Sequence, residues 1–486
     1  MKNLKKILLL ILVTSLFNRC TDHVDYEAIE GYQITSEIYF QQEADYDAAL
    51  VGTYDVLQWL FFNIQLGAIA SEITLCGGES ATDYIGIQQI DDMTHYPENN
   101  VLRQIWQFLY EGVNRANYME ENKANIDFEG KEAMYGEVYF LRAYYYFELV
   151  KFFGDVPLFT EARLTAGQAG TLTRTPKDEV YAQIELDLQN AIASLPNSQS
   201  QVGRVNKYTA YALLGKVLLY QDKFAEAASA LDNVIGVYSL VSDYGSQFLR
   251  FGENGPESVF EIQYSNQSNW YDWGCAHCSE GNYAIIMNGP RGWSGPEYAQ
   301  GWSFNVPTEE FYNSFEEGDS RRDATVLDIE AFAAATGASY TEGYDHTGYF
   351  NNKYIPRAGE SGGQTELNYL TNFRIIRYSD VLLMAAEAYN RGGIDDGLAQ
   401  EFLNQVRRRA FGGDDNDISA SGSALTDAIW EERKFELSLE GHRFFDLVRT
   451  GRASSLIAGF VEGKHEVFPI PQQEVDISGL TQNAGY

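Results

Sequence analysis

Residues 205–235 read VNKYTAYALLGKVLLYQDKFAEAASALDNVI, and their pattern predicts two paired helices. Apolar and small side chains recur every three or four positions in both halves, which is the spacing of one face of an α-helix. The polar turn QDK at 221–223 separates the two halves. Gly215 and Ala227 are small residues where two antiparallel helices would meet, so we expect the helices to pack closely.

The same residues occupy the positions of the 34-residue tetratricopeptide repeat, a helix pair that stacks on further copies of itself. The match lacks the final Pro of the repeat and consists of Tyr211, Leu214, Gly215, Leu218, Ala227, Leu231 and Val234. A second pair within 380–409 has the same offsets at Leu383, Ala386, Ala399, Leu403 and Val406. An unrelated helical bundle does not readily give such matched offsets. The sequence therefore predicts a mainly α fold, a tetratricopeptide-like helical superhelix.

Further helices of the same kind are expected outside these two pairs. Residues 106–118 and 136–153 each have an apolar face, and the partner of the second begins only at Thr175-Pro176. Residues 154–174 are therefore a loop that leaves the repeat. Stretches rich in Gly, Asn, Ser and Tyr lie at 63–100, 242–305 and 332–372. Because such long excursions are usually functional, we expect the helices to be the scaffold and the loops to hold the site.

The composition limits the class of ligand. In 486 residues, 35 Lys and Arg stand against 69 Asp and Glu, which gives a net charge of −34. Such a surface repels phosphates and anionic lipids, so we exclude nucleic acid and the membrane surface as principal partners and favour a neutral ligand. Hydrophobic residues make up 45% of the chain, which excludes global disorder. The aromatic content of 14% suits packed helices or flat stacking platforms.

The first twenty residues have the pattern of an export signal. Three lysines precede the apolar run 7–13, which is too short to span a bilayer. Cys20 follows directly, as in bacterial lipoproteins, where this Cys is lipidated and becomes the mature N-terminus. Arg19 stands where that pattern has a small residue. We expect a signal peptide at 1–19 and lipidation of Cys20; the alternative is ordinary secretion with cleavage elsewhere.

Four sequence blocks lie in order along most of the chain. They are FLRA with LVKFFGDVPL at 140–158, RYSDVLLM with AEA at 377–388, the run 429–451, and FPIPQ with LTQNAGY at 468–486. Together they resemble the signatures of the SusD/RagB family, the nutrient-binding lipoproteins of the Gram-negative outer membrane. Ala484 stands where the family more often has Pro. The blocks are specific as a set, although each one alone is weak.

The resemblance implies a fold, a location and a function. Its fold is a tetratricopeptide superhelix with an irregular C-terminal part, in agreement with the helix pattern. It divides the chain into an N-terminal region at 20–240 and a C-terminal region at 241–486, which holds the ligand loops and the last helices. Family members are lipid-anchored at the cell surface. They capture oligosaccharides or other nutrients and deliver them to a SusC-like TonB-dependent transporter.

The charged residues of the third block lie at helical offsets. Glu431, Glu432, Arg433, Glu436, Glu440 and Arg443 most simply form ion pairs at i,i+3 and i,i+4 spacing. We expect none of them to be catalytic. The run Arg407–Arg409 is expected to be paired with acidic residues, as a charge run in an acidic protein usually is.

Two other functions are weighed against glycan capture. One is capture of peptides or proteins by a member of the same family, and the other is an extracellular glycoside hydrolase. The sequence GESGG at 359–363 fits the G-x-S-x-G motif of hydrolases but lacks the strand before it and the helix after it. With 69 carboxylates, pairs at glycosidase spacing must occur by chance. We therefore expect no enzyme activity, no catalytic residue and no cofactor.

The cysteines predict a small disulfide. Cys275 and Cys278 form a C-x-x-C motif, but neither a βαβ unit nor a second ligand pair surrounds it, which argues against redox and zinc chemistry. In an oxidising exterior a disulfide between them is the expected state. Cys76 is then left over; it is buried and inert, or it pairs with Cys275 or Cys278 instead. The run 414–417 (DDND) lacks the Gly and Glu of a calcium loop, so no metal site is expected.

Aromatic residues in polar loop sequence mark the expected ligand site. Sugars stack their C–H faces on flat rings, and rings held in preformed loops lose little entropy on binding. The candidates in the 242–305 excursion are Trp270, Tyr271, Trp273, Trp293, Tyr298 and Trp302, with Arg291 as a hydrogen-bond donor. The resemblance adds the early loop with Asp83, Tyr84 and Tyr96. Some of these rings are alternatively core plugs, Trp302 above all. A neutral glycan such as a glucan, mannan or fructan is expected.

Overall fold

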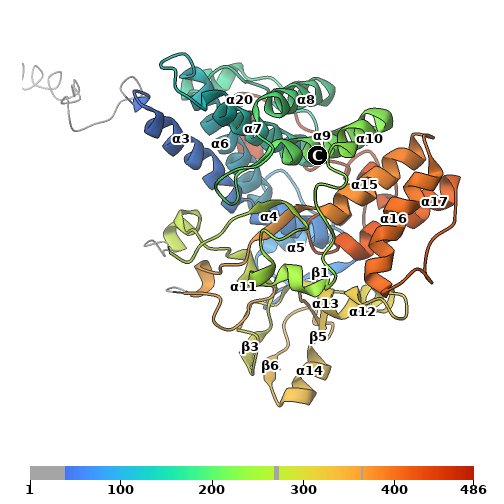
Figure 1. Ribbon diagram of the computed structural model, residues 1–486. Coiled ribbons are helices and arrows are strands. Elements are labelled where there is room, and N and C mark those ends of the chain that lie inside the picture. Colours follow the sequence, from blue (N-terminus) through green and yellow to red (C-terminus); the bar gives the residue numbers. More distant parts are fainter. Residues whose placement is uncertain (1–38, 268–272, 363–364) are drawn as a thin grey trace, which may run out of the picture.

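Paired helices make up the larger part of the structure, a computed structural model that describes residues 39–267, 273–362 and 365–486 (Figure 1). The scaffold helices are α3 (Glu43–Asp55), α6 (Asn100–Glu121), α7 (Lys131–Phe153), α8 (Lys177–Ser194), α9 (Lys207–Leu219), α10 (Phe224–Asp232), α15 (Tyr378–Arg391), α16 (Asp396–Phe411) and α17 (Gly422–Leu437). Contacts run from each helix to the next, α6 to α7, α8, α9, α10, α15 and α16. The expected tetratricopeptide-like superhelix is confirmed.

The two helix pairs predicted from the repeat pattern are present. Asn206 caps α9, because its side chain accepts hydrogen bonds from the backbone N–H groups of Tyr208 and Thr209. Gly215 of α9 must be small, since a Cβ there would lie 2.5 Å from the side chain of Leu231 on α10. The second pair is α15 and α16. Residues 154–174 form the predicted loop. Backbone hydrogen bonds between Val156 and Thr175 join its two ends.

The excursions contain short strands that join distant parts of the chain. Four antiparallel pairs form: β1 (Thr74–Gly77) with β4 (Phe304–Pro307), β2 (Ser258–Ile262) with β8 (Phe373–Arg377), β3 (Arg291–Ser294) with β6 (Ser339–Thr341), and β5 (Val326–Asp328) with β7 (Tyr349–Asn351). Figure 1 shows β3, β6 and α14 below the helical scaffold. These strands were not predicted, because each is only three to five residues long and its partner lies far away in sequence.

Short helices complete the excursions and the C-terminal part. They are α4 (Phe61–Ile69), α5 (Ile85–Asp91), α11 (Ala284–Asn288), α12 (Glu309–Asn313), α13 (Arg321–Thr325), α14 (Ile329–Thr336), α18 (Arg443–Arg449), α19 (Ala453–Leu456) and α20 (Gln472–Ser478). The 3₁₀ turns are η1 (Val56–Trp59), η2 (Ala166–Thr171), η3 (Gly245–Phe248), η4 (Arg250–Gly252), η5 (Trp273–Cys278) and η6 (Thr365–Leu367). The main hydrophobic core is continuous from Phe40 to Leu480, so the scaffold and most of the excursions share one interior.

The prediction of ion pairs within the third block is mostly wrong. Only Glu431 and Lys434 pair locally within α17, at i,i+3 spacing. Glu436 instead lies 2.6 Å from Arg409 and 2.8 Å from Arg377, on two other elements. The physical reason is burial: α17 packs against its neighbours on this face, so each charge must find its partner across the interface rather than in solvent. Arg407–Arg409 are paired with acidic residues, as predicted.

These buried pairs predict a loss of stability in acid. Although burial alone would raise it, Arg449 lowers the pKa of Glu387 to about 2. For Glu436 as well, the nearby charges of Arg409 and Arg377 outweigh the effect of burial and hold its pKa well below the usual range. A carboxyl whose pKa is lowered on folding stabilises the fold above its unfolded pKa of about 4.3, and this contribution is lost as the pH falls through the folded pKa. We therefore expect the midpoint of thermal unfolding to fall between pH 5 and pH 2.

The variant Glu387→Gln separates this effect from general acid denaturation. It should be less stable than the wild type at pH 7 but lose less stability between pH 5 and pH 2. The difference expected for this one group is on the order of 3 kcal/mol. Thermal unfolding followed by circular dichroism at each pH measures it. Equal pH dependence in both proteins would contradict the assignment to Glu387.

Candidate functional site

Strand pairing brings two of the predicted loops together. β1 leads into the early loop and β4 follows the Trp-rich excursion, and Gly77 lies opposite Phe304 in their register. Directly beyond, the N–H of Gly78 donates to the carbonyl oxygen of Ser303 at 2.7 Å. The early loop and the segment 291–303 are therefore neighbours, although more than 200 residues of chain separate them.

Asp83 and Arg291 form an ion pair across these two loops. The Arg291 Nη2 atom lies 2.8 Å from Asp83 Oδ2, and the two side chains are 23% and 30% exposed, respectively. Asp83 also accepts a hydrogen bond from the N–H of Glu79, which fixes its carboxylate within the loop. Because each group keeps part of its surface open, the pair can offer both a donor and an acceptor to a polar ligand.

Two of the predicted aromatic residues, Tyr84 and Trp302, lie near this ion pair. Both contact Tyr283, which was not predicted as a site residue. Tyr84 is half-buried, and its hydroxyl is hydrogen-bonded to that of Tyr283. The ring of Trp302, also half-buried, lies 6.1 Å from the ring of Tyr283. Tyr283 directly precedes the buried helix α11, so its sequence context indicated core rather than site. Tyr84, Tyr283 and Trp302 thus form one aromatic group next to Asp83.

Tyr344 also lies next to the early loop, at Gly78. It is 37% exposed, and its N–H donates to the carbonyl oxygen of Gly78 at 2.8 Å. The neighbouring Gly343 approaches so closely that a Cβ would lie 2.6 Å from the same oxygen. The sequence placed Tyr344 in an irregular excursion without assigning it to the site, because nothing local links it to a loop more than 260 residues earlier.

Trp293, a residue of β3, and Tyr298 belong to a separate apolar cluster that includes Phe332 of α14. Tyr298 is only 5% exposed, and its ring packs 5.0 Å from that of Phe332 on α14. Trp293 is half-buried, with its ring 5.9 Å from Tyr298. Trp293 therefore keeps part of its side chain exposed, whereas Tyr298 beside it is buried.

Tyr96 lies beyond the other end of α5 from Tyr84. Its side chain is 46% exposed, and its neighbour His95 is hydrogen-bonded to the hydroxyl of Tyr486 at 2.7 Å. Tyr96 therefore stands on the side of the C-terminal tail, one helix away from the ion pair of Asp83.

The remaining candidates lie in the loop around the two cysteines. Trp270 and Tyr271 are outside the described residues, as is the side chain of Trp273. Cys275 and Cys278 form a disulfide, and the ring of His277 between them packs 5.0 Å from that of Trp59. Cys20 and the signal segment also lie outside the described residues.

Cys76 is free and buried, so the alternative pairing with the loop cysteines is not formed. Burial raises the pKa of its thiol, which keeps it protonated and unreactive. Cys275, His277 and Cys278 place three potential ligand atoms within 4.8 Å of one another, but the disulfide bond occupies both sulfur atoms.

The fold and these loops define a helical-repeat protein that displays charged and aromatic side chains from its excursions. A sequence profile of the SusD family matches residues 256–459, and a profile described as "Starch-binding associating with outer membrane" matches residues 71–219. The SusD-like protein P2 of Formosa agariphila is 29% identical over 493 residues, covering 93% of this chain and 94% of its own.

Solved structures of related proteins point to the same family. One described as "Laminarin binding SusD-like protein" is 36% identical, with a TM-score of 0.84 over 92% of this chain and all of its own. The surface glycan-binding protein A from Bacteroides thetaiotaomicron, in complex with laminarihexaose, is 29% identical, with a TM-score of 0.82 over 91% and 99%. The chain belongs to the SusD/RagB family. Among the described residues, no helix combines the length and apolar character needed to cross a bilayer.

Proposed function

We propose that this protein is a non-catalytic, cell-surface glycan-binding protein and that its ligand is a neutral glucan of the laminarin type. The observation that carries the proposal is the 36% identity, over 92% of the chain, to a SusD-like protein described as laminarin-binding. A second relative is described in complex with laminarihexaose. An uncharged glucan also agrees with the net charge of −34, which disfavours anionic polysaccharides.

The loop site offers the chemistry that a sugar needs. The rings of Tyr84 and Trp302 provide apolar surface for C–H faces, and the ion pair of Asp83 and Arg291 provides an acceptor and donors for hydroxyl groups. The Arg291 side chain is already held by Asp83 before a ligand arrives, so little side-chain entropy is lost on binding. Trp293 lies two residues after Arg291 on β3 and adds a half-buried ring near the ion pair.

Affinity electrophoresis with product analysis tests the proposed ligand. Native gels that contain laminarin should retard the protein, and the polysaccharide should keep its chain length. Retardation by none of a panel of glycans would overturn the proposal and favour peptide capture. New reducing ends would instead identify a glycoside hydrolase.

The substitution Arg291→Ala tests the ion pair as part of the site. Loss of a charge-assisted hydrogen bond to a sugar hydroxyl should weaken laminarihexaose binding by roughly tenfold to a hundredfold. The thermal midpoint should change little, because a partly exposed ion pair contributes about 0–1 kcal/mol. Calorimetric titration measures the affinity. Arg408→Ala, which removes a comparably exposed pair with Asp417, is the matched control. Unchanged affinity in Arg291→Ala would exclude this residue from the site.

Delivery to a transporter forms the second part of the proposal. A signal peptide at 1–19 and lipidation at Cys20 would anchor the protein to the outer membrane, and a SusC-like TonB-dependent transporter would receive the glycan. The family membership and the N-terminal sequence pattern support this. Purification from membranes in mild detergents should recover a large transporter subunit in stoichiometric amount. Recovery of this chain alone in several detergents would count against the complex.

A further inference from the structure

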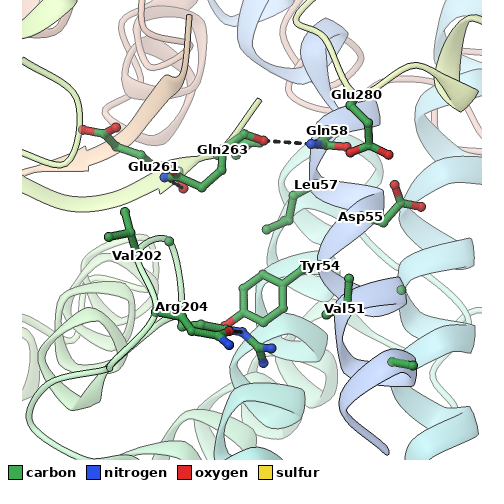
Figure 2. Close-up of a pocket in the computed structure, with 15 residues that line it drawn as sticks. Val51, Tyr54, Asp55, Leu57, Gln58, Val202, Arg204, Glu261, Gln263 and Glu280 are labelled. Atoms are coloured by element: carbon green, nitrogen blue, oxygen red, sulfur yellow. Dashed lines mark hydrogen bonds between the residues drawn. The ribbon is translucent and has the colours of Figure 1, made fainter. Parts of the chain in front are cut away.

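A pocket lies between α3, the turn 201–204 and the end of β2. Its volume is about 560 Å³, which is within the range of small-molecule sites, about 300–1,000 Å³. Figure 2 shows Val51 and Tyr54 on the helix side and Val202 and Gln263 across from them. None of the residues that line it belongs to the group of Asp83, Tyr84, Arg291 and Trp302.

The pocket has hydrogen-bonding groups that the fold does not use up. Gln58 donates through Nε2 to the carbonyl oxygen of Gln263 at 2.9 Å, whereas its Oε1 is buried and accepts no hydrogen bond from the described residues. The side chain of Gln58 also hydrogen-bonds the carboxyl of Glu280. An amide oxygen left without a donor in this way is rare in a folded protein and marks this wall of the pocket as incompletely satisfied.

Glu280 differs from the other charged groups around the pocket. Arg115 lies 2.8 Å from Asp55, and Asp47 lies 2.8 Å from Arg204, so these charges are compensated. Among the described residues, no Lys or Arg forms an ion pair with Glu280. Burial, with the nearby charge of Asp55, raises the pKa of Glu280. This carboxyl therefore has no cationic partner among the described residues and can accept hydrogen bonds from the hydroxyl groups of a ligand.

Apolar side chains frame the same opening. Val51 is 52% exposed and Val202 is 74% exposed, on opposite walls of the pocket (Figure 2). Large apolar side chains at this exposure are normal singly, but here two of them flank a cavity lined by amides and carboxyls. Alternating apolar and hydrogen-bonding surface matches a sugar, which has C–H faces and hydroxyl edges.

The disulfide loop fixes one wall of this pocket. Glu280 follows Cys278 by two residues, and the loop is held on the scaffold where His277 packs against Trp59. Trp59 directly follows Gln58 in η1. The His277 contact thus places the disulfide loop beside η1, and the carbonyl oxygen of Glu280 accepts a hydrogen bond from the N–H of Ser265 at 2.8 Å.

We infer that this pocket is a second carbohydrate subsite, which binds a short neutral oligosaccharide through Glu280 and Gln58, with sugar C–H faces against Val51 and Val202. The ligand class rests on the proposed function. The location of the subsite does not, because it depends on the cavity and its unsatisfied groups. A second subsite would let one protein hold a polysaccharide at two points and so raise its avidity.

Counting bound ligands tests the inference. The full mature chain is titrated with laminarihexaose by calorimetry, and the complexes are counted by native mass spectrometry. The wild type should bind two ligands. Ala48→Trp, at the exposed mouth of the pocket, should reduce the count to one, and Glu280→Ala should weaken that subsite about tenfold. Ile477→Trp, at an exposed position on α20, is the control and should bind two.

The outcomes separate this inference from the proposed function. One ligand in the wild type that is unaffected by Ala48→Trp and Glu280→Ala, but weakened by Arg291→Ala, overturns the second subsite and leaves the proposed function standing. If Ala48→Trp and Glu280→Ala weaken laminarihexaose binding but Arg291→Ala does not, the pocket subsite is supported and the loop site is excluded. A wild type that binds no laminarihexaose but binds a cationic peptide in this pocket overturns both. Thermal midpoints within a few degrees of the wild type show that each variant is folded.

Discussion

The substitution Arg377→Met is expected to lower the free energy of unfolding by about 3–5 kcal/mol, because it leaves buried carboxylates without their counter-charge. Arg377 is almost completely buried and lies 2.7 Å from Glu257, 2.8 Å from Glu436 and 2.7 Å from Glu440. Met fills much of the same space as Arg, so the decrease in the free energy of unfolding reports the missing charge rather than a cavity. Urea denaturation at pH 7, followed by circular dichroism, gives the free energy.

Arg408→Met is the matched control for this experiment. Arg408 lies on α16 and pairs with Asp417, but its side chain is 38% exposed. Water compensates the remaining carboxylate there, so we expect a change of about 0–1 kcal/mol. Equal effects of the two substitutions would show that the buried network around Arg377 does not stabilise the fold in the way proposed.

Replacement of Trp270 and Trp273 by Ala should abolish glycan binding at the loop site and leave the thermal midpoint within a few degrees. Both tryptophans lie among Asn, Ser, Tyr and Gly, where an aromatic ring has no evident use in a core. Stacking on such rings supplies much of the binding energy of a sugar site. Calorimetric titration with laminarihexaose, together with thermal unfolding, measures the two quantities.

Phe251→Ala provides the control, because Phe251 is also an aromatic residue of the 242–305 excursion and is 78% exposed. Its removal should leave both binding and stability unchanged. If binding at the loop site survives the loss of both tryptophans, or if their replacement unfolds the protein, the proposed stacking platform is wrong.

The scaffold could be predicted because its signals are local. The pair α9 and α10 is predicted by its apolar spacing and by Gly215 at the position that faces Leu231, all within about thirty residues. The ion pairs of α17 could not be predicted in the same way. Offsets within one helix do not reveal that Glu436 faces Arg377 and Arg409 from other elements, since that depends on how the helices pack.

The candidate site was predictable only in part for a related reason. The family resemblance pointed to Asp83, and the loop composition pointed to Arg291, but neither indicated that the two form one ion pair. Tyr283 was missed because an apolar run follows it, and Tyr344 because only tertiary structure places it at Gly78. Tyr298 has the same sequence context as Trp293, yet the packing of α14 buries it.

The pairing of β1 with β4 has a consequence for the order in which the protein matures. Most scaffold helices contact a near neighbour in the chain, and such contacts form quickly; the contact of α10 with α15 is the exception in this series. The pairing of β1 with β4 closes a loop of more than 200 residues at a higher entropic cost. The scaffold can therefore be assembled while Asp83 and Arg291 are still apart. A chain caught at that stage would have a nearly native helical spectrum and no working ligand site, so helicity alone is a poor measure of competence after export or refolding.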